Sequence, residues 1–97
     1  MKDSIEHIAI NVADIDSAVE WYISSFDCEL TAKTAQKAVI SFANCKLVLV
    51  LPSIERQHTA FVKRDAATYG ELTPRGNEAP STYVSDPAGN IIKLFAG

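Results

Sequence analysis

One pattern of residues occurs twice in this chain of 97 residues. In residues 7–14 and again in residues 58–65, a His, an Ala and an Asp keep the same spacing, with apolar residues between them. Each copy also ends in a similar strand-like segment, at residues 47–49 and 92–94. An internal repeat limits the fold strongly, because each copy must form the same supersecondary unit. The repeat therefore predicts a pseudo-symmetric sheet with a pocket between its halves.

The first copy predicts a strand, a helix and then three more strands. Residues 5–12 alternate between two faces, as a strand requires. Asp16 is the predicted N-cap of a helix that runs to about Phe26, with a capping box at Ser17 and Glu20 as the alternative. Three further strand patterns follow, at residues 29–34, 38–43 and 46–51.

The second copy is shorter where the first has its helix. Only residues 66–69 fit a helix before Gly70, and residues 73–80 are polar and typical of a loop. We expect the second helix to be reduced to one turn or missing. The predicted fold class is α+β, with paired βαβββ modules in one domain of residues 1–97. Module 1 covers about 4–52, a linker covers 53–57, and the truncated module 2 covers about 58–97.

Two stretches carry a resemblance to a known family. Residues 5–22, IEHIAINVADIDSAVEWY, are similar to the opening of vicinal-oxygen-chelate proteins, and residues 83–94, YVSDPAGNIIKL, resemble their closing signature. This superfamily includes glyoxalase I, the bleomycin-resistance proteins, the extradiol dioxygenases and methylmalonyl-CoA epimerase. The resemblance implies the glyoxalase/bleomycin-resistance/dioxygenase fold, in which a curved sheet forms a cleft. It does not imply one activity, because a single fold hosts many chemistries.

The resemblance also implies four inward-facing positions that hold a divalent metal in metal-using relatives. In this chain they map to His7, Val48, His58 and Lys93. Two imidazoles suit Zn, Ni, Fe or Mn, but valine has no donor atom and a lysine ammonium repels a cation. We therefore expect no complete metal site. The alternative is that other residues complete it, from Glu6, Asn11, Gln57 or a carboxylate of a partner chain.

The same face of the sheet is the expected ligand-binding surface. Lys93 is either a cation that binds an anionic ligand, or a base, or a lysine that extends from a terminal strand to water. The two histidines are either metal ligands or hydrogen-bonding residues of the pocket. Aromatic residues on strands can line a pocket for a flat organic ligand, although core packing is the commoner role. The predicted ligand-binding residues are His7, His58, Lys93, Val48, Phe42, Tyr83 and Phe95.

Three functions are compatible with this pattern. The first is a protein that binds a small organic molecule in the cleft without a complete metal site, as bleomycin-resistance proteins do. The second is a metal-dependent lyase, isomerase or dioxygenase, in which the metal acts as a Lewis acid. The third is a structural or interaction module without a small ligand.

Net charge and the distribution of apolar residues limit the kinds of partner that the chain can bind. The net charge of −3 gives no electrostatic case for nucleic acid or for an anionic membrane surface. No apolar stretch is typical of a signal peptide or a membrane span, which favours a cytoplasmic protein. A missing second helix would leave apolar sheet surface in water, at about 25 cal/mol per Å². We therefore expect a homodimer, and exchange of modules between the two chains remains open.

Overall fold

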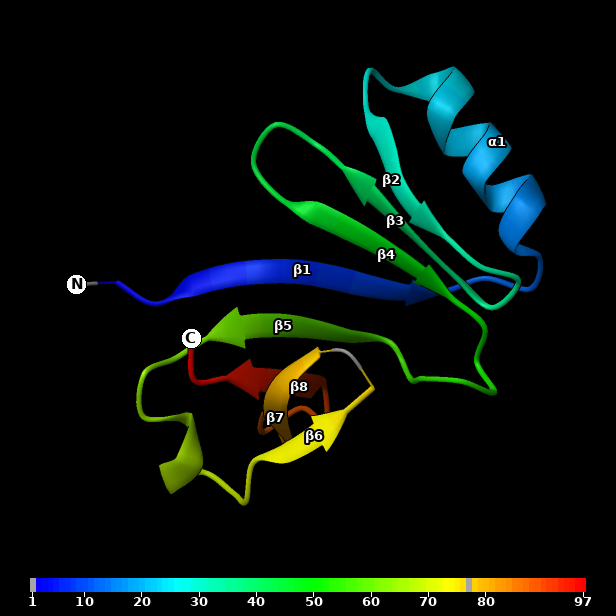
Figure 1. The fold of residues 1–97 in the computed structure, drawn as a ribbon. Coiled ribbons are helices and arrows are strands. Elements are labelled where there is room, and N and C mark those ends of the chain that lie inside the picture. The colour runs from blue at the N-terminus through cyan, green and yellow to red at the C-terminus, as the bar shows by residue number, and fades with distance from the viewer. Residues whose placement is uncertain (1, 77) are drawn as a thin grey trace. The chain divides into compact units, whose positions relative to one another are not determined.

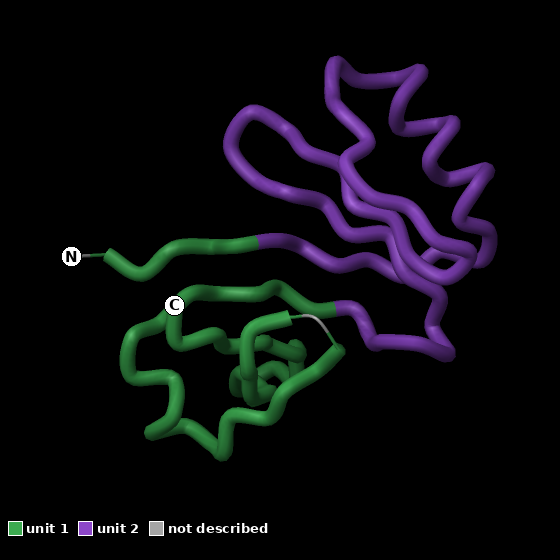
Figure 2. Tube along the Cα trace, in the orientation of Figure 1, with its two compact units in different colours: residues 1–6, 58–97 green, residues 7–57 purple. Residues whose placement is uncertain are grey.

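The computed structural model describes residues 2–76 and 78–97, and it divides them into two compact units (Figures 1 and 2). The first unit, drawn in purple and labelled unit 2 in Figure 2, comprises residues 7–57. The second unit, drawn in green and labelled unit 1 there, comprises residues 2–6 with the described part of 58–97. The elements in chain order are β1 (Ser4–Asn11), α1 (Ile15–Ser25), β2 (Glu29–Lys33), β3 (Lys37–Ser41), β4 (Lys46–Val50), β5 (His58–Val62), the 3-10 turn η1 (Ala66–Thr68), β6 (Thr73–Arg75), β7 (Glu78–Ser85) and β8 (Ile91–Phe95).

In the unit of residues 7–57, the strands lie in the order β2-β3-β4-β1. β4 pairs in parallel with β1 and antiparallel with β3, and β2 pairs antiparallel with β3. Helix α1 covers one face of this sheet, where Ile15 and Val19 pack with Ala38, Ile40 and Leu49 in a buried apolar core. Because side chains alternate along a strand, the other face carries Val39, Val48 and Val50.

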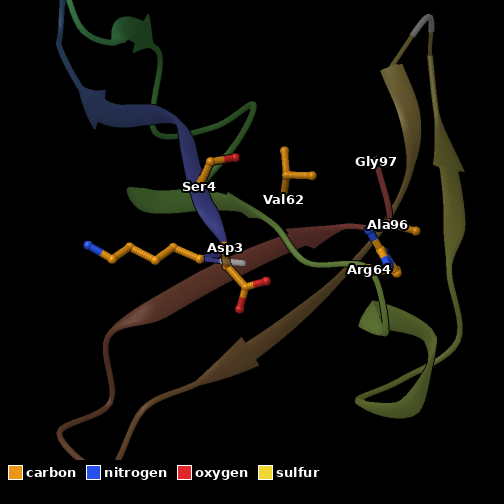
Figure 3. Close-up of a pocket in the computed structure, with 7 residues that line it drawn as sticks. Asp3, Ser4, Val62, Arg64, Ala96 and Gly97 are labelled. Carbon is orange, nitrogen blue, oxygen red and sulfur yellow. The ribbon is translucent and has the colours of Figure 1, made fainter.

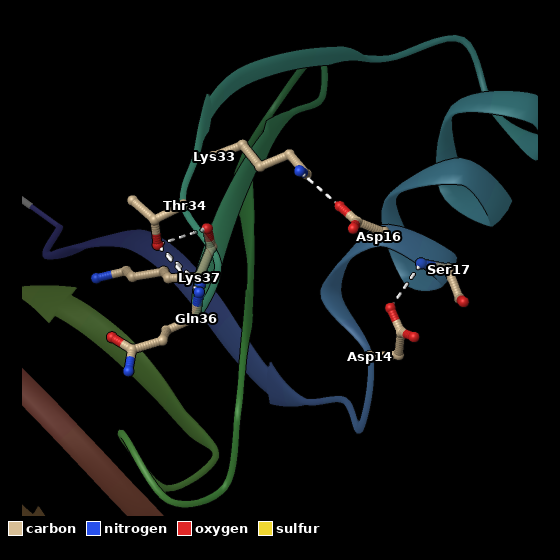
Figure 4. A network of polar contacts seen from close by, with 7 residues as sticks. All are labelled: Asp14, Asp16, Ser17, Lys33, Thr34, Gln36 and Lys37. Carbon is tan, nitrogen blue, oxygen red and sulfur yellow. Dashed lines mark hydrogen bonds and ion pairs between the residues drawn. The ribbon is translucent and has the colours of Figure 1, made fainter.

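The first turn of α1 differs from the prediction. Figure 4 shows that Asp14 is the N-cap, since its Oδ1 accepts a hydrogen bond of 3.1 Å from the backbone N–H of Ser17. The N-cap predicted at Asp16 is therefore wrong by two residues. A helix that begins at Ile15 can bury that side chain, which is only 4% exposed, in the core. Asp16 lies in the first turn and forms an ion pair with Lys33 of β2 instead.

The second unit repeats the strand arrangement, with the order β5-β8-β7-β6. β8 pairs in parallel with β5 and antiparallel with β7, and β6 pairs antiparallel with β7. The single turn η1 stands where the first unit has α1, so the reduced helix predicted from the sequence is confirmed. Gly70 follows this turn, and a Cβ there would lie 2.5 Å from the Oγ1 of Thr82. The backbone at Gly70 can therefore lie directly against β7.

The loop predicted at residues 73–80 is wrong, because the described part of this segment contains β6 and the start of β7. The prediction rested on the polar composition of this segment, which also contains two prolines. Pro74 lies in the edge strand β6, where a missing N–H need not break the sheet. Pro80 lies in β7 where the register with β6 shifts, between the Arg75–Glu78 and Thr73–Ser81 pairs, and an irregular ladder tolerates proline.

The turn predicted at residues 86–90 is confirmed. The Asp86 carboxylate accepts hydrogen bonds from the backbone N–H groups of Ala88 and Asn90, both at 2.9 Å, and from the Asn90 side chain at 2.8 Å. These bonds stabilise the charged carboxylate and lower the pKa of Asp86, with the Asn90 side chain as the largest cause. Gly89 has a φ of +87°, which other residues rarely adopt, so the turn needs glycine there. The turn delivers the chain into β8.

Candidate ligand-binding site

The two units place their predicted site residues at equivalent positions. His7 lies in β1 and His58 begins β5, and both side chains are buried. Two residues further along each strand, Ala9 is paired with Val48 and Ala60 is paired with Lys93. The register therefore makes Val48 the counterpart of Lys93, as the sequence repeat predicts.

Val48 lies in purely apolar surroundings. It is 4% exposed and belongs to a small cluster with Ala9 and Val50, against which Val39 packs. Val48 shares its face of the sheet with His7, because Ala9, its partner in β1, is two residues from His7. The position thus contributes hydrophobic surface and no donor atom.

Lys93 is the most unusual buried residue of the second unit. Its side chain is 0% exposed, and its Nζ lies 2.9 Å from each carboxylate oxygen of Glu78. The Nζ also lies 5.3 Å from the ring centroid of Phe95 and 5.6 Å from that of Tyr83. An ammonium taken out of water is stabilised only when charged or polar groups surround it closely. Glu78 and two aromatic faces provide part of that environment.

Tyr83 is the centre of this group of side chains. The guanidinium carbon of Arg75 lies 4.5 Å from its ring centroid, and the His58 ring meets it edge-on at 5.7 Å. Arg75 is held in place because its Nε donates a 3.1 Å hydrogen bond to the Oγ of Ser81. We call the group formed by His58, Arg75, Glu78, Tyr83, Lys93 and Phe95 the Tyr83 cluster.

Strand pairing explains why these residues meet. Tyr83 is the partner of Lys93 across β7 and β8, and Ala60 is the partner of Lys93 across β5 and β8, so all three share one face. His58 and Phe95 lie two residues from Ala60 and Lys93 and share that face too. The structure therefore brings four predicted residues together: His58, Tyr83, Lys93 and Phe95.

Phe42 does not join them. It follows β3 and packs on the helix side of the first unit, where its ring meets that of Phe26 at 5.9 Å. The α1 residues Trp21 and Tyr22 extend this aromatic group. His7 and Val48 also belong to the first unit, on its other face.

Two members of the Tyr83 cluster, Arg75 and Glu78, were not predicted from the sequence. Both lie in the segment predicted to be a loop. Glu78 is not opposite Lys93 in any strand pair, so the register of the strands does not predict their contact. The sequence could have indicated such a residue by one physical argument: a lysine buried on a pocket face requires an anionic partner.

A hollow of about 240 Å³ adjoins the Tyr83 cluster. Glu78 and Phe95 belong to both, and the remaining wall is formed by Glu6, Val62, Ala79 and Gly97. A small ligand in this hollow would contact an aromatic ring, aliphatic side chains and the carboxylate that holds Lys93. The two hollows of the next paragraph contain none of the predicted ligand-binding residues.

Two larger hollows lie elsewhere, each of about 510 Å³. The one shown in Figure 3 is lined by Asp3 and Ser4 near the start of β1, Val62 and Arg64 at the end of β5, and residues that follow β8. The other lies beside the N-terminus of α1, where Asp14 and Thr34 already accept backbone hydrogen bonds (Figure 4).

The residues at the mapped positions do not fit a metal. Val48 has no lone pair to donate, and the Lys93 ammonium, which would repel a cation, is paired with the Glu78 carboxylate. Within residues 2–76 and 78–97, no three His, Cys, Asp or Glu side chains gather closely enough to hold an ion. Structural and catalytic metal sites use three or four protein ligands.

Similarity to solved structures supports the fold. No protein-family model and no curated protein matches the chain. A hypothetical protein, BH1468, from Bacillus halodurans C-125 aligns over 97% of this chain and 94% of its own, with a TM-score of 0.69 and 16% identity. Lactoylglutathione lyase from Agrobacterium tumefaciens aligns over 94% and 91%, with a TM-score of 0.50 and 21% identity.

The chain therefore has the fold of the vicinal-oxygen-chelate superfamily, in a form with a truncated second module. The resemblance predicted from residues 5–22 and 83–94 is confirmed at the level of the fold. In the described part of the chain, no helix is long and apolar enough to cross a bilayer.

Proposed function

We propose that this chain binds a small organic molecule at the Tyr83 cluster, without a complete metal site. The observation that carries the proposal is the fully buried Lys93 ammonium, held by Glu78 beside aromatic rings and an apolar-walled hollow. A buried ion pair contributes little net stability, since apolar side chains of similar volume would serve as well or better. Its presence next to a hollow therefore favours a role in recognition over a role in folding.

The comparison structures add support of a general kind. The Agrobacterium tumefaciens neighbour is by name a lactoylglutathione lyase, so this fold accommodates a small-molecule substrate in that protein. The chemistry of that enzyme is not carried over, because Val48 and Lys93 do not fit a metal. A metal-dependent lyase, isomerase or dioxygenase is the second candidate, implied by the resemblance of residues 5–22 and 83–94 to a superfamily with metal-using members.

A ligand screen in the presence of a chelator separates the two candidates. We expect at least one aromatic or aliphatic compound to raise the thermal midpoint of the wild-type protein by several degrees in EDTA, because binding only the folded state stabilises it. Tyr83→Ala should lose this shift. Phe42→Ala, which also removes an aromatic ring but lies outside the cluster, should keep the shift. Differential scanning fluorimetry gives each variant's shift relative to its own ligand-free midpoint.

Other outcomes would change the proposal. A shift that appears only after nickel, zinc, iron or manganese is added would favour the metal-dependent candidate. In that case His7→Ala and His58→Ala should each abolish metal binding, measured as metal per subunit. A broad compound library that gives no shift under either condition would contradict both candidates and favour an interaction module.

We also propose that the protein acts in the cytoplasm as a homodimer. The face of the second unit next to η1 supports the dimer. Among the described residues η1 is a single turn of three residues, and Phe61, Val84 and Ile92 on that face are only half-buried. Light scattering should give twice the 10.5 kDa mass of one chain. Ile92→Lys should shift the mass towards one chain, because it places a charge on the apolar face, whereas a monomeric wild type would contradict the proposal.

A further inference from the structure

We propose that the ligand is a small hydrophobic carboxylate, and that its carboxylate takes the place of Glu78 on Lys93. This inference rests on the function proposed above and specifies its ligand. Glu78 is then a built-in counterion, which holds the site when no ligand is bound and moves aside when one arrives.

Burial decides which partner of the ion pair can move. The Lys93 side chain is 0% exposed, whereas the Glu78 side chain is 29% exposed. A carboxylate already in contact with water regains its hydration at little cost when it turns outward, but a buried ammonium cannot leave without crossing the packed face. The exchangeable member of the pair is therefore Glu78.

Charge decides what can replace it. Lys93 bonds both oxygens of Glu78 at 2.9 Å, so the vacated position suits a planar group with two anionic oxygens. Arg75 places a second cation on the same Tyr83 ring, at 4.5 Å, which further favours an anion in the cluster.

An organic amine is the competing ligand, because Glu6 and Glu78 both line the hollow. An amine bound to Glu78 would compete with Lys93 for that carboxylate and weaken the pairing of a buried charge. A carboxylate ligand preserves the pairing, since one anion replaces another. The exchange of anions is therefore the more favourable process.

The walls of the hollow set the body of the ligand. Val62, Ala79 and Phe95 present aliphatic and aromatic surface, and the volume is about 240 Å³. Pockets for drug-sized ligands begin at roughly 300 Å³, so this one suits a compound of about one ring. Benzoate matches these requirements in size, shape and charge.

Three one-ring compounds of similar size test the charge requirement: anionic benzoate, neutral benzamide and cationic benzylamine. Titration calorimetry at fixed ionic strength should show that the wild type binds benzoate more tightly than the neutral and the cationic analogue. Glu78→Gln removes the competing anion and keeps the shape, so it should bind benzoate at least about tenfold more tightly, as expected for a charge-assisted bond gained without displacement. Lys93→Met should lose benzoate binding. Lys63→Met, which removes a lysine from an exposed ion pair with Asp3, should keep it.

Each outcome either supports or overturns the inference. Equal or tighter binding of benzamide or benzylamine would overturn the carboxylate while leaving a small-molecule site intact. Unchanged or weaker benzoate binding by Glu78→Gln would overturn the exchange with Glu78. If Glu78→Gln does not fold, Glu78→Asp serves, because its shorter side chain also frees Lys93. If no compound of the three binds but the library screen succeeds, only this inference fails; if both fail, the proposed function fails with it.

Discussion

Glu78→Ala is expected to lower the free energy of unfolding by about 3 kcal/mol, because it removes both contacts of 2.9 Å from a fully buried ammonium. This value is at the lower end of the range for a broken buried ion pair, since Glu78 is itself partly exposed. Lys93→Met should cost less than half as much. It fills the same space with apolar atoms, and the remaining carboxylate can turn to water.

The test is whether Glu78→Ala lowers the free energy of unfolding more than Lys93→Met does. Urea denaturation monitored by circular dichroism measures both values. Glu71→Ala, which removes an exposed glutamate from the same unit, is the matched control and should change stability by less than about 0.5 kcal/mol. A loss of stability that is equal for Glu78→Ala and Lys93→Met would contradict the view that Glu78 is the movable partner.

Leu49→Ala is expected to lower the free energy of unfolding by about 2–5 kcal/mol, because it leaves a cavity in the core beneath α1. Leu49 is 0% exposed and packs with Ile40 and Val19. Domains of this size are stable by about 5–15 kcal/mol in total, so this one change removes a large share.

The control for this prediction is the same substitution at an exposed strand position. Leu30 lies in β2, all of whose residues are exposed, and Leu30→Ala should cost less than about 1 kcal/mol. Chemical denaturation gives both free energies of unfolding, and they can be compared directly when both variants show the same dependence on denaturant concentration. Equal losses at the two positions would mean that α1 does not cover a close-packed core.

The strand pattern and the repeat could be predicted because alternation with a period of two is written directly in the sequence. The equivalence of Val48 and Lys93 follows from the repeat, whereas the shared face of Tyr83 and Lys93 depends on the pairing of β7 with β8 and was not predicted. The residue at which the helix begins was harder to predict. Asp14 and Asp16 are equally good caps in isolation, and only the burial of Ile15 decides between them.

The candidate site was predictable only in part, because contacts between strands again override local sequence preference. Pro74 and Pro80 indicate a loop by local propensity, but pairing with the neighbouring strands overrides that preference. The partner of Lys93 lies in this misjudged segment. Contacts between two long side chains obey no strand register, so no spacing rule points from Lys93 to Glu78.

The parallel pairing of β8 with β5 has a consequence for the order in which the protein can form during synthesis. All strands of the unit of residues 7–57 are available once residue 57 has been made, so that unit can close early. In the other unit, β8 lies between β5 and β7, yet it follows both in the sequence. Residues 2–6 therefore precede residues 7–57 in synthesis, yet their own unit is complete only after β8 has been made.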